Sequence, residues 1–179
     1  MKIETETRPY SLRKFVENDL EKVLDINSKC LPENYTSSFF MQLYKAHPET
    51  FLVAETNQVL IGYIMCRVET GFSEINRFRL AKKGHVVSVA VLPEHRRNGI
   101  GVALMLRAVK AMEAYGCSES YLEVRVSNNS AIAMYEKLGY RILRRIAGYY
   151  FDGEEASVMA RKIPIDPEQT KFFDTSKFS

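Results

Sequence analysis

The residues best suited to chemistry lie in a short basic stretch, LPEHRRNGIGVAL, between an apolar strand-like run and a helix-like segment. In it, Arg96 and Arg97 precede Gly99 and Gly101. A helix start leaves amide N–H groups unpaired and carries the positive end of the helix dipole, so it holds phosphate well. Glycines let phosphate oxygens approach the backbone, and arginines add charged donors. The pattern predicts a phosphate-binding turn, and its alternative is a tight surface turn with solvated arginines.

The residues around this turn favour a ligand with two phosphates. Between residues 75 and 101 the chain has six basic side chains and one acid, Glu94. Two familiar phosphate loops are excluded, because no Gly-Lys-Ser/Thr ends the turn and no Gly-x-Gly-x-x-Gly opens the helix. We therefore expect a diphosphate ligand held by a different kind of turn.

The composition is typical of a globular protein of one domain. The 179 residues are 46% apolar and 26% charged, and no repeat or low-complexity run interrupts residues 10–161. A net charge of +3 is too small for a field that would bind nucleic acid. The longest uncharged stretches have 11 residues, too few for a membrane-spanning helix. Three cysteines without metal-ligand spacing and an N-terminus without an apolar signal region predict a cytoplasmic location and no metal site.

Strand-like and helix-like segments must position the basic turn. Strands are expected at residues 8–15, 51–55, 59–68, 84–92, 120–126, 141–151 and 156–161, and helices at 18–30, 37–47, 99–115 and about 131–138. The strand at 84–92 is nearly free of charge and should be central and buried on both faces, whereas residues 71–84 form a long polar connection. We expect Asn18 to cap the first helix, Gly139 to end the last one, and Asp152-Gly153 to turn the final hairpin.

Hairpins at both ends, with alternating elements between them, predict an α/β fold with a mixed sheet and helices on both faces. The domain is expected to span residues 1–163. Residues 164–179 have two prolines, mixed charge and three phenylalanines, and are expected to form a C-terminal tail.

Two spaced motifs resemble a known family. The pattern R-x-x-G-x-G at residues 96–101 looks like motif A of the GCN5-related N-acetyltransferases (GNAT), and N-x-x-A-x-x-x-Y-x-x-x-G-Y at residues 128–140 looks like motif B. The segments LPENY, GHVVSVAV, LEVRVSN and GYYFDGEEA resemble archaeal NatA-type catalytic subunits and RimI-like protein N-terminal acetyltransferases. The resemblance spans residues 10–161. It implies the GNAT acyl-CoA N-acyltransferase fold, with a mixed, mostly antiparallel sheet and helices on both faces.

The resemblance implies acetyl-CoA (coenzyme A) as the cofactor. Backbone of a splayed strand would pair with the pantetheine arm, and the amides of the basic turn would hold the pyrophosphate. Tyr135 would lie near the sulfur and donate a proton to the departing thiolate, although core packing is its alternative role. The expected cofactor-binding residues are Val89, Ala90, Val91, Arg96, Arg97, Asn98, Gly99, Ile100, Gly101, Val102, Asn128, Tyr135, Glu136 and Lys137.

An amine must lose a proton before it attacks a thioester, and a protein α-amine with a pKa of about 7.7–8.0 is mostly protonated at pH 7. By resemblance, the proton acceptors are Glu33, His85 and Glu123, which with Tyr135 form the expected catalytic set. Which of the three is the main base stays open. In the alternative reading, Glu33 is a solvated acid in a loop and His85 is a histidine with satisfied hydrogen bonds at a strand start. Glu123 would then be an exposed or arginine-paired acid on a strand.

The same resemblance predicts the substrate-binding residues. Leu31, Pro32 and Tyr35 would wall the pocket for the first side chain, and the hydroxyls of Tyr149 and Tyr150 would bond the peptide backbone. The alternative for the two adjacent tyrosines is an ordinary place in a strand, with one ring packed and one wet.

The function implied is transfer of acetyl from acetyl-CoA to the α-amine of protein or nascent-chain N-termini, by direct attack in a ternary complex. Ser or Ala as first residue is favoured, with Met-initiated chains as a further class. The alternatives are acetylation of a lysine side chain or small-molecule amine, and a non-catalytic acyl-CoA sensor. No nucleic acid or membrane is expected as a direct partner, and an auxiliary or ribosome-associated subunit is left open.

Overall fold

A single twisted sheet runs through residues 10–164, the part of the chain that the computed structural model describes. Its strands are β1 Ser11–Lys14, β2 Phe51–Thr56, β3 Val59–Phe72, β4 Leu80–Val91, β5 Glu119–Arg125, β6 Arg141–Ile146 and β7 Ala156–Lys162. The strand order is β1-β2-β3-β4-β5-β7-β6, and every neighbouring pair is antiparallel except β4 and β5. The expected mixed, mostly antiparallel sheet is confirmed.

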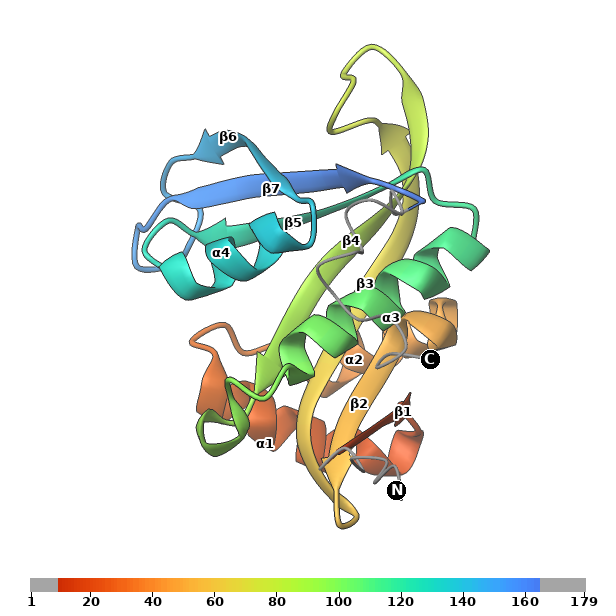
Figure 1. Cartoon of the computed structure of the whole chain (residues 1–179), viewed down its shortest axis with the longest axis vertical. Helices are drawn as coiled ribbons and strands as arrows, with labels where there is room; N and C mark the ends of the chain where they lie inside the picture. The colour runs from red at the N-terminus through yellow and green to blue at the C-terminus, as the bar shows by residue number, and fades with distance from the viewer. Residues whose placement is uncertain (1–9, 165–179) are drawn as a thin grey trace, which may run out of the picture.

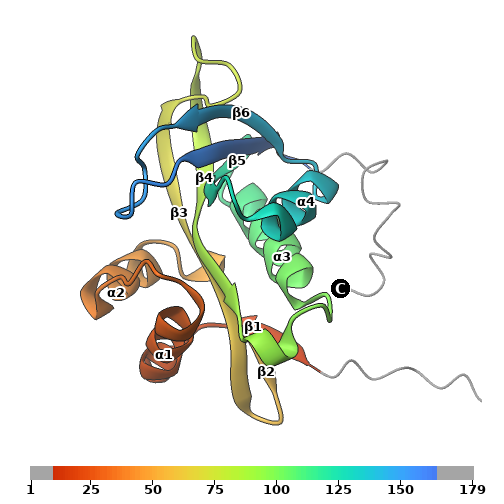
Figure 2. The ribbon, with the colours of Figure 1, turned by 90° about the vertical axis from the view of Figure 1, so that its left-hand side faces the viewer.

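Helices cover both faces of the sheet, as Figure 2 shows. They are α1 Leu20–Cys30, α2 Ser37–Ala46, α3 Ile100–Ala114 and α4 Asn129–Lys137. On one face α1 and α2 pack over a core rich in aromatic rings, including Phe15, Phe40 and Tyr63. On the other face α3 and α4 cover an aliphatic and methionine-rich core that includes Leu104 and Met105. Burial of apolar side chains on both faces is the main force that holds the three layers together.

The expected polar connection at residues 71–84 is wrong in its extent, because half of it is strand. β3 continues to Phe72 and β4 starts at Leu80, and these two residues are paired in the antiparallel ladder. The resulting hairpin projects beyond the other strands at the top of Figure 1. Residues 74–80 near its tip are mostly exposed, so it lacks the apolar alternation by which a strand is recognised in sequence. β4 is central as expected and contributes to the cores on both faces, with Val86 in the core under α3 and Ala90 in the core under α1.

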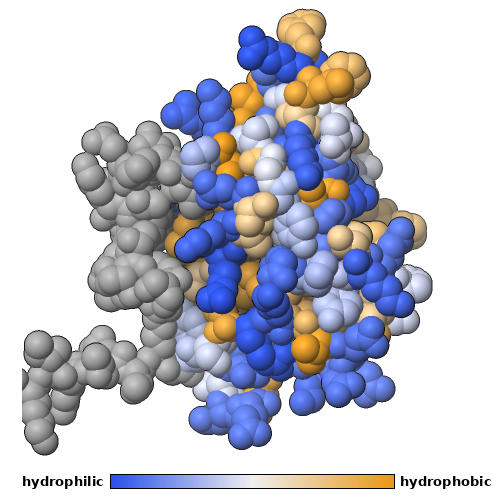
Figure 3. Space-filling model, turned by 90° about the vertical axis from the view of Figure 1, so that its right-hand side faces the viewer, coloured by the Kyte–Doolittle hydropathy of each residue, from blue (hydrophilic) through white to orange (hydrophobic). Residues whose placement is uncertain are grey.

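Apolar side chains outside the core gather on this hairpin. Phe72, Phe78 and Leu80 are largely exposed there. Figure 3 shows a mostly hydrophilic face with apolar atoms at its top, where the hairpin lies. The hairpin is therefore held by its own ladder and by ion pairs at its base rather than by packing.

The expected cap of the first helix is also wrong. A 3₁₀ turn, Glu17–Asp19, precedes α1. The Asp19 carboxylate, not Asn18, accepts the free backbone N–H of Val16, at 3.0 Å, and it also receives two hydrogen bonds from Arg13. Arg13 of β1 therefore fixes the Asp19 carboxylate in the position where it accepts the backbone N–H that precedes the first helix.

The last hairpin differs from the expectation in where its first strand ends. β6 stops at Ile146, so Tyr149 and Tyr150 lie in a loop and not in a strand. Glycines at 148 and 153 have positive φ and bend this loop, and Gly139 likewise ends α4 with φ of 85°, as expected. Apart from Pro164, the expected tail at residues 164–179 lies outside the described residues. Among residues 10–164, no helix has the length and apolar character needed to cross a bilayer.

Candidate active site

The site begins where β4 and β5 separate. The two parallel strands are paired only at residues 83–85 and 119–121, although β4 continues to Val91 and β5 to Arg125. Beyond the paired residues, the β4 edge that faces β5 has no strand partner among the described residues. A cavity of about 880 Å³ opens at this split, and its lining includes the second halves of both strands. An unpaired strand edge of this kind offers backbone donors and acceptors to an extended ligand.

The basic turn and the start of α3 form one end of the cavity. Gly99 immediately precedes α3 with φ of 77° and has no side chain to cap the helix. Arg97 also has a positive φ, 66°, which is uncommon for a residue with a side chain. Arg96, Arg97, Gly99, Ile100, Gly101 and Val102 all line the cavity. The first amides of α3 therefore point into a cavity that arginines also line, an arrangement that suits a phosphate.

Helix α4 supplies the neighbouring wall. The side chain of Asn128 caps the helix by accepting the backbone N–H of Ala131 at 3.2 Å. Met134 packs against Gly101, and a Cβ added at Gly101 would lie 3.3 Å from the Met134 sulfur. Tyr135 lines the cavity but is 6% exposed, and burial raises its pKa, so it stays protonated. Its neutral hydroxyl can therefore donate a proton.

Most of the expected cofactor-binding residues line this single cavity. Val89, Ala90 and Val91 of β4 do so, as do Asn128 and Lys137 of the α4 region. Two do not: Asn98 turns its amide back to the carbonyls of His95 and Arg96, and Glu136 lies outside the lining. The cavity lining also includes several residues that the sequence analysis did not single out, among them Ser88, Ser130, Met134 and Arg125.

Two loops line the other end of the cavity. The connection between α1 and α2 brings Leu31, Pro32, Glu33 and Tyr35, and the loop between β6 and β7 brings Tyr149 and Tyr150. The two tyrosine rings meet edge to face at 5.0 Å. Burial raises the pKa of Tyr149 to about 12, so its hydroxyl stays a hydrogen-bond donor at neutral pH. All five expected substrate-binding residues therefore meet around one opening.

Arg125, which the sequence analysis missed, joins these two loops. Its guanidinium binds Glu33 at 2.5 Å, Asp152 at 2.8 Å and Glu154 at 2.7 Å, and lies 4.0 Å from the centre of the Tyr150 ring. A hydrogen bond from the Glu154 backbone, together with Arg125, holds the pKa of Asp152 below its usual range. A hydrogen bond from the Ser127 side chain, again together with Arg125, does the same for the pKa of Glu154. Asp152 and Glu154 are therefore ionised at neutral pH, and with Glu33 they keep the arginine fixed between the loops.

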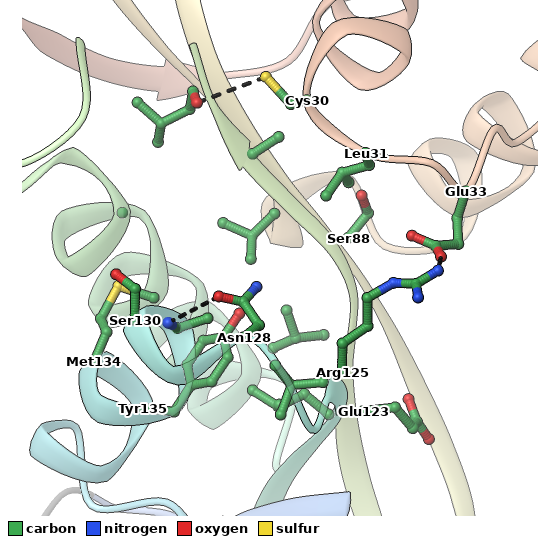
Figure 4. A pocket seen from close by; sticks show the side chains of 18 of the residues that line it. Cys30, Leu31, Glu33, Ser88, Glu123, Arg125, Asn128, Ser130, Met134 and Tyr135 are labelled. Carbon is green, nitrogen blue, oxygen red and sulfur yellow. Dashed lines mark hydrogen bonds and ion pairs between the residues drawn. The ribbon is translucent and has the colours of Figure 1, made fainter. Parts of the chain in front are cut away.

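The expected proton acceptors do not all reach the cavity. Glu33 and Glu123 line it, whereas His85 does not. His85 lies behind Glu123, with its Nε2 2.6 Å from a carboxylate oxygen of that residue. In Figure 4 the side chains of Glu33, Arg125 and Glu123 lie on one side of the β4 ribbon, and those of Asn128, Met134 and Tyr135 lie on the other. The cavity thus joins a basic end that suits a phosphate to an end with two carboxylates, which suits proton removal from a bound amine.

Comparison with known proteins agrees with this geometry. The model of the acetyltransferase (GNAT) family matches residues 20–140. An N-alpha-acetyltransferase of Sulfurisphaera tokodaii is 46% identical over 155 residues, which are 86% of this chain and 93% of that protein. The catalytic subunit NAA10 of the N-terminal acetyltransferase A complex of Arabidopsis thaliana is 36% identical over 155 residues, 85% of this chain and 77% of that protein.

Solved structures show the same fold. Ard1 from Thermoplasma volcanium has a TM-score of 0.75 and 28% identity, and the match covers 87% of this chain and 98% of that one. Naa20 of Chaetomium thermophilum, solved in complex with a bisubstrate analogue, has a TM-score of 0.77 and 33% identity, with 88% and 89% of the two chains covered.

Proposed function

The chain belongs to the acetyltransferase (GNAT) family, and from this membership and its site we propose that it acetylates the α-amine of protein N-termini with acetyl-CoA. One observation carries the proposal. A single cavity joins the basic turn at the start of α3 to the two carboxylates, Glu33 and Glu123. An activated acyl donor and an amine that must lose a proton need these two environments side by side.

Residues of the cavity fit acetyl-CoA, which when bound supplies the activated acetyl group. At the turn, Gly99 has the left-handed backbone that favours glycine, and the space beside Gly101 is bounded by Met134. We propose that the amides of residues 97–102 and the side chains of Arg96 and Arg97 hold the diphosphate. The open edge of β4 at residues 89–91, with Asn128 opposite, would hold the amide groups of the pantetheine arm.

The other end of the cavity fits a peptide N-terminus. The loop tyrosines present hydroxyl donors and acceptors, and Leu31, Pro32 and Tyr35 enclose the space where a first side chain would lie. We propose that this space favours Ser or Ala as first residue and admits Met with lower efficiency. The relatives named for α-amine acetylation, rather than for lysine or small-molecule acetylation, support this assignment.

The mechanism we propose is direct attack in a ternary complex. Glu33, His85 or Glu123 removes the proton of the substrate ammonium, directly or through water, and a backbone N–H of β4 stabilises the oxyanion that forms on the acetyl carbonyl. Tyr135 donates its proton to the departing thiolate. Because the amine attacks the acetyl group directly, no acyl-cysteine is required.

The test is acetylation of matched peptides with isotope-labelled acetyl-CoA, read by mass spectrometry. Each peptide is made with a free N-terminus and with a blocked one, and both contain an internal lysine. We expect one label per free-N-terminus peptide, faster for Ser and Ala than for Met as first residue. Label on the blocked peptides would contradict the proposal and assign the activity to lysine side chains.

A further inference from the structure

The side chain of His85 is held on both ring nitrogens and on one face. Its Nδ1 lies 3.2 Å from Nη2 of Arg67, and its Nε2 lies 2.6 Å from Oε2 of Glu123. The ring of Tyr121 stacks on it at 4.4 Å with an interplanar angle of 1°. Strand register produces this cluster, because Arg67, His85 and Tyr121 are direct neighbours across β3, β4 and β5.

The two contacts fix where the proton of the imidazole lies. A guanidinium has N–H donors and no lone pair, so the Nδ1 that faces Arg67 must accept. An imidazole with an accepting Nδ1 carries its proton on Nε2, and that N–H donates to Glu123. His85 in this arrangement is neutral, and neither of its nitrogens has a lone pair free for a substrate proton.

Arg67 also has a carboxylate partner, Glu69. Its Nε lies 3.0 Å from Oε2 of Glu69, whose other oxygen accepts the hydroxyl of Tyr121 at 2.6 Å. Burial raises the pKa of Glu69, but the hydrogen bond from Tyr121 and the charge of Arg67 lower it by more, so the pKa lies below its usual value. Glu69 is therefore ionised at neutral pH. Lys83 lies 3.7 Å from the same carboxylate. The groups that contact the imidazole are therefore Arg67 from β3 and Tyr121 and Glu123 from β5. Three charged or polar groups lie behind these contacts: Glu69 beside Arg67, Lys83 over the Tyr121 ring, and Tyr149 of the β6–β7 loop near Glu123.

Glu123, and not His85, faces the cavity. Glu123 is part of the cavity lining and His85 is not. The histidine uses one carboxylate oxygen of Glu123, and no residue among 10–164 donates a hydrogen bond to the other, Oε1. That oxygen is therefore free to accept a proton from a ligand in the cavity.

We propose that Arg67 is a positioning residue that keeps His85 as the neutral Nε2–H tautomer, so that Glu123 and not the imidazole takes the substrate proton. In this step an N–H bond of the substrate ammonium breaks and its electron pair stays on nitrogen. An O–H bond forms at Oε1, directly or through one water, and His85 keeps its own proton throughout. The inference rests on the proposed function, since it specifies the base for that reaction.

The first test is the protonation state of His85, which needs no substrate. The chain has only three histidines, so long-range ¹H–¹⁵N correlation spectra can resolve each ring, with His85→Gln giving the assignment. We expect the neutral Nε2–H form of His85 at pH 7. In Arg67→Met the loss of the guanidinium leaves Nδ1 without its donor, so the Nε2–H form should no longer be the single tautomer.

Two variants keep this test interpretable. Arg67→Lys retains a positive donor and should keep the Nε2–H tautomer of His85. Arg79→Met removes an exposed arginine of the hairpin tip and is the matched control. A protonated Nδ1 in the wild type at pH 7, or an unchanged tautomer in Arg67→Met, would overturn the assignment of Arg67. Since neither measurement uses catalysis, this outcome is distinct from a failure of the proposed function.

The second test compares turnover. Glu123→Gln should lower kcat about 100-fold, the scale for a lost general base. His85→Gln should lower it only about 10-fold, because the glutamine amide can still donate to Glu123. Arg67→Met should lower kcat and leave the KM for the peptide unchanged, and Arg67→Lys should restore kcat. A larger loss in His85→Gln than in Glu123→Gln would show that the imidazole is the acceptor and overturn the inference.

Discussion

Residue 99 must combine a left-handed backbone with an unobstructed approach to the first amides of α3. Its φ is 77°, a value that costs a residue with a side chain about 1–2 kcal/mol. We expect Gly99→Asp to weaken coenzyme A binding at least tenfold in titration calorimetry, because a carboxylate would lie beside the diphosphate. Unchanged affinity for coenzyme A would show that this turn is not part of the binding site.

Gly116 provides the matched control for this change. It has a φ of 80°, nothing within 4 Å of its Cβ position, and a place at the opposite end of α3. Gly116→Asp should therefore lose a similar free energy of unfolding and keep full affinity for coenzyme A. The pair separates the effect of backbone strain from the effect of charge at the site.

Single residues also show which part of the site can be found in a sequence. The basic turn can, because a helix start with glycines and arginines is a local property of consecutive residues. Arg125 and Arg67 could not, because their partners Glu33 and His85 lie 92 and 18 residues away. Strand register and the course of two loops bring these pairs together, and neither is visible in a local pattern.

At the scale of elements, helices were predicted better than strand ends. The apolar lines of α1 to α4 repeat at helical spacing and need no partner to be recognised. β3 and β4 are longer than expected because their outer residues pair with each other in an exposed ribbon, and β6 is shorter because glycines bend the chain after it. A strand is defined by its partner, so its ends are the part that a sequence alone specifies least.

The join between β1 and α1 has a pH dependence that can be measured. Burial raises the pKa of Asp19, but hydrogen bonds from Arg13 and the amide of Val16 lower it more, so that it lies below its usual value. Because the pKa is lower in the folded chain, the stabilisation is complete above the unfolded pKa of about 3.9 and is lost as pH falls through the folded value.

Asp19→Asn should therefore lower the free energy of unfolding at pH 7 by about 1–3 kcal/mol, the scale for a lost charged hydrogen bond. In urea titrations the difference from the wild type should shrink as pH falls below 4. Asp25→Asn, which removes an exposed pair with Lys29, is the control and should change stability by less than about 0.5 kcal/mol. If Asp19→Asn lowers the free energy of unfolding equally at pH 7 and pH 3, then packing, and not charge, stabilises the connection between β1 and α1.

At the scale of the whole molecule, the sheet has two halves that meet at the split and share one apolar core under α3 and α4. One half contains β1 to β4 with α1, α2 and α3, and the other contains β5, β6 and β7 with α4 (Figure 1). The strand ladder between them is only three residues long on each side. The cavity lies across this join, with the start of α3 on one side and α4 on the other.

A ligand that contacts both walls should therefore couple the two halves. We expect coenzyme A to slow amide hydrogen exchange not only at residues 96–103 but also in α4 and in residues 119–125, because binding to the closed arrangement lowers the population in which the halves separate. The Gly99→Asp variant under the same conditions gives the baseline without binding. Protection confined to residues 96–103 would show that the ligand rests on one half alone, and that the short ladder is rigid without it.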